Sequence, residues 1–184
     1  HKTNARTAEM CKLTENSSRD VQIAFANELS LICDKANINV WELIGLANKH
    51  PRVNILSPGP GVGGHCIAID PWFLVADFKE DAKIIKAARD INNYKAEWVI
   101  EKVKKKTAKF NKNELIIACL GIAYKPDIDD LRESPSLEIT EELIHEGYNV
   151  MVVEPNIEKF DKFEIHSIEE AMKKADVIVI LVPH

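Results

Sequence analysis

A cysteine that closes a glycine-rich loop is the feature of this sequence best suited to chemistry. Residues 57–72 read SPGPGVGGHCIAIDPW, so four glycines fall within six residues and Cys66 follows directly after His65. Asp70 lies four residues beyond the thiol. A thiolate is a strong nucleophile, and a nearby carboxylate can orient or deprotonate water. The stretch therefore predicts a reactive thiol that works beside a carboxylate.

Asp70 has a structural interpretation as well. Asp70 followed by Pro71 resembles a helix start, with Asp70 as the N-cap and Pro71 in the first turn. Cys66 would then lie just before a helix N-terminus, where free N–H groups favour the thiolate. The capping role and the role toward water are compatible, and both stay open at this point.

The glycines of this loop formally match the dinucleotide-binding pattern GxGxxG at Gly59, Gly61 and Gly64. We reject that interpretation, because the pattern needs a strand before it and a helix opening inside it. Glycine also lets a backbone approach a ligand closely and adopt positive φ. The loop either folds over a ligand or forms a tight connection between helices.

Two other groups of polar residues could take part in chemistry. Lys12 and Asn16 are four residues apart on one face of a predicted helix, where they could bind an oxyanion or hold a water molecule. Surface Lys–Asn pairs are common, so the spacing alone is a weak signal. In the polar loop 121–136, Lys125 and Arg132 could reach phosphates, or they could pair with acidic residues of the same loop.

Helices are expected to position Lys12, Asn16, Cys66 and Asp70, which lie in the first 110 residues. Uninterrupted helical periodicity predicts a helix over 4–35, a short helix over 40–49, a helix that starts at residue 70 and a long helix over 81–110. The apolar stripe of the first helix comprises Phe25, Leu29, Ile32, Cys33 and Ala36. The stripe of the last comprises Ile84, Ala87, Ala88, Ile91, Tyr94, Trp98 and Val99.

The pattern changes near residue 113. The segments 114–122, 149–155 and 176–183 are strand-like, and 136–148 and 167–175 between them are helical. This alternation predicts right-handed crossovers and a parallel sheet. We predict an α/β protein with an all-helical module over 1–110, followed over 111–184 by a partial Rossmann-like parallel α/β domain.

Composition excludes several classes. The chain has 184 residues, a net charge of −5 and a pI near 5.7, so it has no global basic field for nucleic acid. It has no run of 18 apolar residues and no signal peptide, which favours a cytoplasmic protein without a membrane contact. Because the chain starts with His1 instead of Met, we expect it to be a fragment.

The cysteines show neither a CxxC pair nor His/Cys zinc spacing, so we expect no metal site. Cys119 lies in an apolar strand-like run and is predicted to be a core residue. Cys11 and Cys33 are predicted as core or helix-surface thiols.

Five segments together resemble the UDP-glucose/GDP-mannose dehydrogenase family, NAD-dependent enzymes that oxidise a nucleotide sugar to its uronic acid. They are AEMCKLTEN, NELSLICDKANINVWE, PGPGVGGHCIAIDPWFL, GIAYKPDIDDLRESPS and VVEPN, in family order along nearly the whole chain. The detail of the first three is most similar to the branch that acts on UDP-N-acetylhexosamines, above all UDP-N-acetyl-D-mannosamine.

The resemblance implies a role for each matched residue. Cys66 corresponds to the catalytic nucleophile, with Lys12, Asn16 and Asp70 stabilising oxyanions and positioning water around it. The residues expected to contact the UDP-sugar are Gly61, Gly63, Gly64, Tyr124 and Lys125, together with Arg52, which reaches the substrate of a partner subunit. Arg132 is expected to contact NAD.

The resemblance also implies a homodimer through the central helices, a possible higher oligomer and a part in polysaccharide synthesis. The family's N-terminal NAD-binding domain has no counterpart here, so we expect this chain alone not to turn over. Three alternatives stay open: a dehydrogenase of another UDP-sugar (UDP-GlcNAc, UDP-GalNAc or UDP-glucose), a non-catalytic nucleotide-sugar-binding module, and a dimerisation fragment without ligand affinity.

Overall fold

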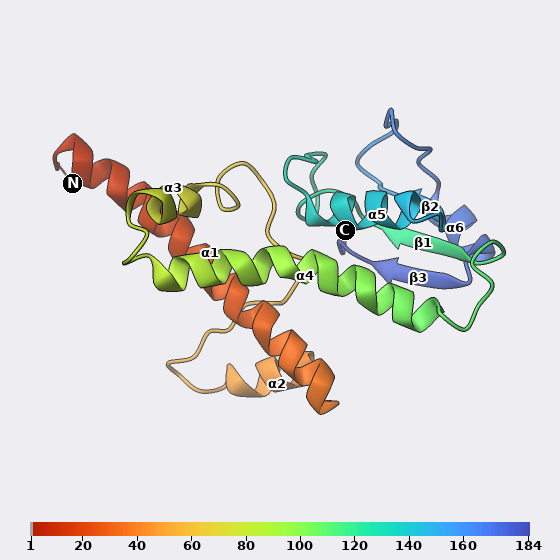
Figure 1. Ribbon diagram of the computed structural model, residues 1–184, viewed down its shortest axis with the longest axis horizontal. Helices are drawn as coiled ribbons and strands as arrows, with labels where there is room; N and C mark the ends of the chain where they lie inside the picture. Colours follow the sequence, from red (N-terminus) through yellow and green to blue (C-terminus); the bar gives the residue numbers. More distant parts are fainter. Residues whose placement is uncertain (1) are drawn as a thin grey trace. The chain divides into compact units, whose positions relative to one another are not determined.

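The computed structural model describes residues 2–184, which form two compact units that divide between Lys95 and Ala96 (Figure 1). The first unit is all-helical, and the second holds a three-stranded parallel sheet with helices. This confirms the predicted α/β class with a helical module. The units divide inside helix α4 (Lys83–Thr107). The domain limits 1–110 and 111–184 stay a prediction from the sequence pattern.

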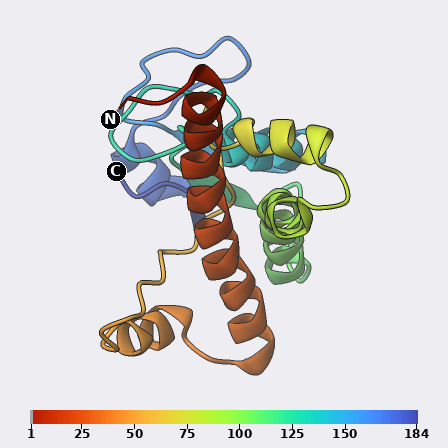
Figure 2. The same cartoon turned by 90° about the vertical axis from the view of Figure 1, so that its left-hand side faces the viewer.

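In the helical unit, α1 (Ala5–Ala36) supports the other elements. It begins after Asn4, whose side chain accepts a hydrogen bond of 2.9 Å from the N–H of Thr7. The helix α2 (Val40–Ala47) begins after Asn39, which caps it in the same way. Helix α3 (Asp70–Asp77) packs against α1, and α2 lies near the C-terminal end of α1 (Figure 2). These bounds confirm the predicted helices.

The predicted apolar stripes on the two long helices are wrong in part. Phe25, Ile32, Ile84 and Tyr94 are exposed. Beside small apolar residues such as Ala26 and Ala88, the side chains that α1 and the first half of α4 bury include a polar set, namely Asp20, Asn27, Ser30, Arg89, Asn92 and Lys95. The reason is that most of their polar atoms pair across the two helices, although Oδ2 of Asp20 and Nε of Arg89 are buried without a hydrogen-bond partner among the described residues.

The second unit is built on a parallel sheet. Its strands are β1 (Ile116–Leu120), β2 (Asn149–Val153) and β3 (Val177–Ile180), in the spatial order β2-β1-β3. Helices α5 (Pro135–His145) and α6 (Ile168–Lys174) connect them. The order confirms the parallel α/β prediction, because chain order reverses on the two sides of β1 as in doubly wound sheets.

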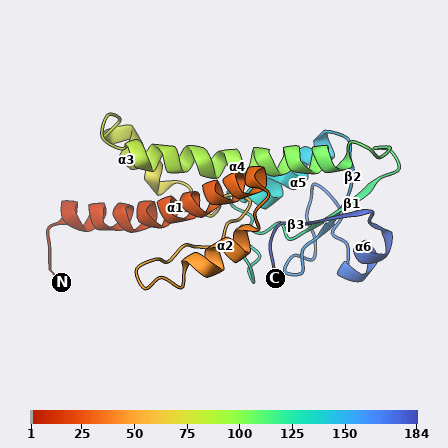
Figure 3. The ribbon, with the colours of Figure 1, turned by 90° about the horizontal axis from the view of Figure 1, so that it is seen from below.

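Helices cover both faces of this sheet. Ile117 and Cys119 of β1 pack with Ile139 and Leu143 of α5 and with the last turns of α4 on one face. On the other face, Ala118 of β1 packs against α6 (Figure 3). Burial on both faces explains why the strands read as continuous apolar runs.

The loop that follows β1 is held close to the end of β3. Gly121 has φ +85°, and a Cβ atom at this position would lie 2.5 Å from Cβ of Val182. Glycine is therefore required here both for its backbone conformation and for its lack of a side chain. The contact positions the start of the loop 121–136 at the carboxyl edge of the sheet. Within residues 2–184, no helix is both long enough and apolar enough to cross a membrane.

Candidate active site

Cys66 lies in a turn that leads directly into α3. Its carbonyl oxygen accepts hydrogen bonds from the N–H groups of Asp70 at 2.8 Å and of Ile69 at 3.1 Å. A bond between residues four apart closes one turn of backbone, which keeps Cys66 close to Asp70 at the start of α3. The Cys66 side chain is half-buried. A thiol that reaches the surface beside a carboxylate can meet a substrate carbon.

Asp70 does not cap α3, so the prediction of an N-cap is wrong. The helix begins at Asp70 itself, and the preceding cap residue Ile69 makes no side-chain capping bond. The Asp70 carboxylate faces α1 instead, where Oδ2 accepts a hydrogen bond of 2.5 Å from Nδ2 of Asn16. The hydrogen bond from the buried Asn16 amide on α1 thus takes the place of a capping bond within α3.

The predicted pair Lys12 and Asn16 joins this group. Nζ of Lys12 donates to Oδ1 of Asn16 at 3.4 Å, which leaves the Asn16 amide nitrogen to face Asp70. Lys12 also lies 3.8 Å from Glu15, and its side chain is largely exposed. The structure therefore links three of the four predicted catalytic side chains by hydrogen bonds and the fourth, Cys66, to Asp70 through the backbone.

The glycine loop before Cys66 is fixed to the helical unit. Residues 57–69, which we call the cysteine loop, lie between α2 and α3, so the element before the glycines is a helix and not the strand that a dinucleotide-binding fingerprint follows. The N–H of Gly59 donates to Oδ1 of the buried Asn27 at 2.8 Å. Gly64 has φ +83°, which glycine adopts without strain. Gly61 and Gly63 lie between these points as half-buried backbone.

Arg52 is exposed in the turn after α2 and takes no part in the hydrogen bonds that join Lys12, Asn16 and Asp70. A clamp closes that turn. Asn48 Nδ2 donates to the carbonyl of Ile55 at 2.9 Å, and Asn48 Oδ1 accepts from the N–H of Ile55 at 2.7 Å. The clamp presents Arg52 at the surface, as a residue that reaches beyond its own subunit would require.

The remaining predicted residues lie in the second unit, on the loop after β1. Nζ of Lys125 lies 5.6 Å from the centre of the Tyr124 ring. Nη2 of Arg132 donates to Oδ2 of Asp130 at 2.6 Å, and its Nε to Oδ1 at 3.0 Å. The alternative in which a loop carboxylate pairs with Arg132 is therefore realised in this structure. Ligands of parallel sheets bind at this carboxyl edge.

The sequence analysis missed Glu154, which organises this edge. The side chain is buried directly after β2, and its Oε2 accepts from the N–H groups of Ile122 and Ala123 at 2.9 and 3.0 Å. Nε2 of His184 lies 3.1 Å from the same oxygen. A carboxylate immediately after a buried strand, within VVEPN, is the signal that could have indicated it.

The sequence analysis also missed the polar network under the cysteine loop. Nη1 of Arg89 donates to Oδ1 of Asp20 at 2.7 Å, and Asn92 Nδ2 donates to the same oxygen at 2.8 Å. Burial raises the pKa of Asp20, whereas the charge of Arg89 opposes that rise. Asn92 Oδ1 in turn accepts from Nδ2 of Asn27 at 2.9 Å. The sequence does hold a signal for this network, namely polar residues at helical spacing on both long helices, with an acidic residue on one and a basic residue on the other.

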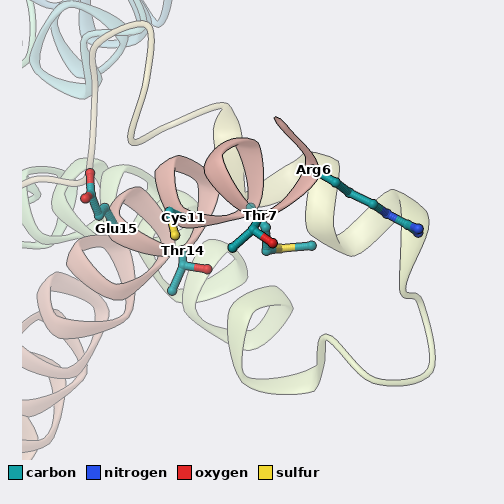
Figure 4. A pocket seen from close by; sticks show the side chains of 6 residues that line it. Arg6, Thr7, Cys11, Thr14 and Glu15 are labelled. Carbon is teal, nitrogen blue, oxygen red and sulfur yellow. The ribbon is translucent and has the colours of Figure 1, made fainter. Parts of the chain in front are cut away.

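The other cysteines differ from Cys66 in their surroundings. Cys33 is buried, and burial raises the pKa of the fully buried Cys119 thiol to about 12, against a hydrogen bond with Thr140 that lowers it. Cys119 is thus confirmed as a core residue. Cys11 is exposed and lines a shallow depression of about 540 Å³ on the first turns of α1, together with Arg6, Thr7, Met10, Thr14 and Glu15 (Figure 4). In the described part of the chain, no three His, Cys, Asp or Glu side chains are grouped so that they could hold a metal ion.

Comparisons with known proteins match both units. The model of the UDP-glucose/GDP-mannose dehydrogenase family central domain matches residues 6–94, and that of the family's UDP-binding domain matches residues 118–184. The chain is 57% identical to a UDP-N-acetyl-D-mannosamine dehydrogenase of Escherichia coli K12 and 54% identical to an NDP-N-acetyl-D-galactosaminuronic acid dehydrogenase of Ralstonia solanacearum. Each alignment covers 99% of this chain, but 46% and 44% of those relatives.

Solved structures agree with the curated relatives. The UDP-N-acetyl-mannosamine dehydrogenase of Staphylococcus aureus superposes with a TM-score of 0.87 at 47% identity. The UDP-D-ManNAc dehydrogenase of Pyrococcus horikoshii does so with a TM-score of 0.87 at 42% identity. Both cover 99% of this chain and 43% of the solved chain. The chain thus spans a little less than half the length of the proteins it matches.

Proposed function

Because the chain belongs to the UDP-glucose/GDP-mannose dehydrogenase family, we propose that it carries the cysteine site of an NAD-dependent UDP-sugar 6-dehydrogenase. The substrate we propose is UDP-N-acetyl-D-mannosamine, oxidised at C6 to UDP-N-acetyl-D-mannosaminuronate. The observation that carries this proposal is the hydrogen-bonded series Lys12–Asn16–Asp70, one helical turn from Cys66. The names of the relatives at 57% and 47% identity support the choice of sugar.

The proposed reaction explains why a thiol is needed. Conversion of the C6 alcohol to a carboxylate removes four electrons, and NAD supplies the chemistry by accepting one hydride in each of two oxidations. The Cys66 thiolate adds to the C6 aldehyde, which forms a C–S bond and a thiohemiacetal. This carbon again carries an oxygen and a hydride, so its oxidation to a thioester resembles the first step. Water then replaces sulfur, which releases the carboxylate and restores the thiol.

The three polar side chains act on oxygen atoms in these steps. Lys12 and Asn16 stabilise the negative oxygen that develops on C6 when the thiolate adds and when water attacks. Asp70 accepts a hydrogen bond from Asn16, which holds its carboxylate in place to orient or deprotonate the attacking water. A positioned general base contributes about 10²–10⁴-fold to such a step.

Other residues of the chain would hold the ligands. We propose that the backbone at Gly61, Gly63 and Gly64 lies against the sugar, and that the nucleotide contacts come from Tyr124 and Lys125. Arg132 would contact NAD, since a guanidinium held by Asp130 can exchange that carboxylate for a phosphate. The position of this loop at the carboxyl edge of a parallel sheet supports these roles.

We also propose a homodimer through the helical unit, with Arg52 reaching the partner's substrate. Support comes from the exposed apolar side chains Phe25, Ile32, Ile84 and Tyr94 of the two long helices, which offer apolar surface that a partner could cover. Sedimentation of the chain tests the dimer, and a monomer at all concentrations would contradict it.

The test of the proposed function uses the complete polypeptide that contains this chain. Uronic acid formation would be measured with NAD and four substrates: UDP-N-acetylmannosamine, UDP-N-acetylglucosamine, UDP-N-acetylgalactosamine and UDP-glucose. We expect the highest kcat/KM with the first. Preference for UDP-N-acetylgalactosamine would favour the activity named for the Ralstonia relative instead. Binding of a UDP-sugar without any oxidation would instead support the alternative of a non-catalytic nucleotide-sugar-binding module.

A further inference from the structure

Two asparagines of one helix hold the two ends of the segment that carries the thiol. Asn27 of α1 accepts the N–H of Gly59 at 2.8 Å, and Asn16 of α1 donates to the Asp70 carboxylate at 2.5 Å. Cys66 lies between these two anchors. Because eleven residues make about three helical turns, Asn16 and Asn27 lie on the same face of α1, about 16 Å apart. The helix therefore braces the cysteine loop at both ends.

The anchor at Gly59 has no local substitute. Residues 58 and 60 are prolines, which have no N–H, so Gly59 supplies the single backbone donor of this stretch. Asn27 is fully buried and is itself oriented by its neighbour, since its Nδ2 donates to Oδ1 of Asn92 at 2.9 Å. That bond turns the Asn27 oxygen toward the loop. The buried network of α1 and α4 thus determines where the loop backbone lies.

We propose that Asn27 is a positioning residue of the cysteine site, which acts through the backbone of Gly59 to keep Cys66 in reach of the aldehyde. This inference rests on the proposed function, and it adds a residue with no expected contact to substrate. Only the Asp70 end of the loop stays anchored when the Asn27 bond is lost. The thiol then samples positions from which it cannot attack, and a displacement of about 1 Å can cost about 10²-fold in rate.

The consequence is a change in products, not only in rate. The aldehyde made in the first oxidation is either captured by Cys66 or lost to solvent. Loss ends the sequence after one NADH, whereas capture continues to the acid and a second NADH. The ratio of free aldehyde to acid is therefore a property of the folded site. Partial unfolding leaves this ratio unchanged, because an unfolded molecule makes neither product.

Gly59 offers a matched pair of variants that leaves Asn27 in place. A Cβ at residue 59 would have its nearest neighbour, the carbonyl oxygen of Gly61, at 3.9 Å, which is ordinary contact. Gly59→Ala thus keeps the N–H and the anchor, whereas Gly59→Pro removes the donor. A second pair works from the helix. Asn27→Ala removes the anchor, and Cys33→Ala truncates another buried side chain of α1 while it leaves the hydrogen bonds of Asn27 with Gly59 and Asn92 in place.

The test traps free aldehyde with hydroxylamine during turnover of the complete enzyme and counts acid and NADH. We expect Gly59→Pro and Asn27→Ala to raise the ratio of aldehyde to acid about tenfold or more over wild type. Gly59→Ala and Cys33→Ala should keep the wild-type ratio. Amide exchange of the cysteine loop gives a readout that needs no cofactor, and it should quicken in Asn27→Ala but not in Cys33→Ala.

Two results would overturn the inference while the proposed function stands. In one, the folded Gly59→Pro and Asn27→Ala enzymes form acid with no more free aldehyde than wild type. In the other, Cys33→Ala releases as much aldehyde as Asn27→Ala, which would mean that general loosening of the helical unit causes the release. If the wild-type enzyme itself forms no acid, the proposed function is wrong, and the inference about Asn27 is then wrong as well.

Discussion

The amide of Asn16 and the carboxylate of Asp70 lie 54 residues apart in sequence and form a hydrogen bond of 2.5 Å. This bond joins α1 to the first residue of α3 and fixes which oxygen of Asp70 faces the helix. The backbone N–H of the same residue donates to the carbonyl oxygen of Cys66. The bond between Asn16 and Asp70 therefore brings a residue of α1 and a residue of α3 together in one site.

We expect Asp70→Asn to stop the sequence at the last step. The amide cannot deprotonate water, so kcat for acid formation should fall by about a hundredfold or more. The thioester on Cys66 should then accumulate, and intact mass measured after acid quenching would show the added UDP-sugar.

The control for this variant is Asp77→Asn, at the exposed end of the same helix, which should keep wild-type kcat. Turnover by Asp70→Asn at the wild-type rate would exclude a role for Asp70 in hydrolysis.

The cysteines should differ widely in reactivity toward iodoacetamide. Because burial raises the pKa of Cys119 to about 12, very little of that thiol is ionised at pH 8. Peptide mapping of the native protein should find the label on Cys66 and the exposed Cys11, and on Cys119 only after unfolding. Equal labelling of Cys119 in the native state would contradict its placement in the core.

The buried ion pair of the helical unit should matter more than an exposed one on the same helix. Asp20→Asn leaves the Arg89 charge buried without its carboxylate, so the free energy of unfolding should fall by about 3 kcal/mol or more. Asp90→Asn breaks the exposed pair with Lys86 and should cost less than about 1 kcal/mol. Urea unfolding compares the two, and equal losses would show that the buried network is not formed.

Two glycines of the second unit separate backbone strain from steric contact. Gly147 has φ +83° with open space around it, so Gly147→Ala should cost about 1–2 kcal/mol. Gly121 has a similar φ, but its added methyl group would collide with Val182, so Gly121→Ala should cost about 1–3 kcal/mol more. Thermal unfolding measures both, and identical losses would mean that the ends of β1 and β3 are not in contact.

The elements of this fold could be predicted because their signals are local. Asn4 and Asn39 cap helices a few residues away, and the apolar runs of the three strands are continuous in sequence. The spacing of Lys12 and Asn16 is equally local. The pairing of Asp20 with Arg89 has no local signal, because 69 residues separate the two. The face of α1 that carries Asp20 is therefore the buried one, and Phe25 lies outside it.

The local rule also failed at Asp70. Its sequence context predicts a helix cap, but Asn16 on another helix takes the carboxylate. Hydrogen bonds made across the fold can thus replace the ones that a short window favours. The anchor from Asn27 to Gly59 belongs to the same class, since nothing within the loop indicates it.

The most direct test of the account is the number of NADH molecules formed per UDP-N-acetylmannosamine consumed by the complete enzyme, for wild type and Cys66→Ser. The account predicts two NADH and one uronic acid for wild type. It predicts no acid, and at most one NADH per sugar, for the variant, because serine cannot replace the thiolate as nucleophile. Two NADH per sugar with Cys66→Ser at an undiminished rate would contradict the account.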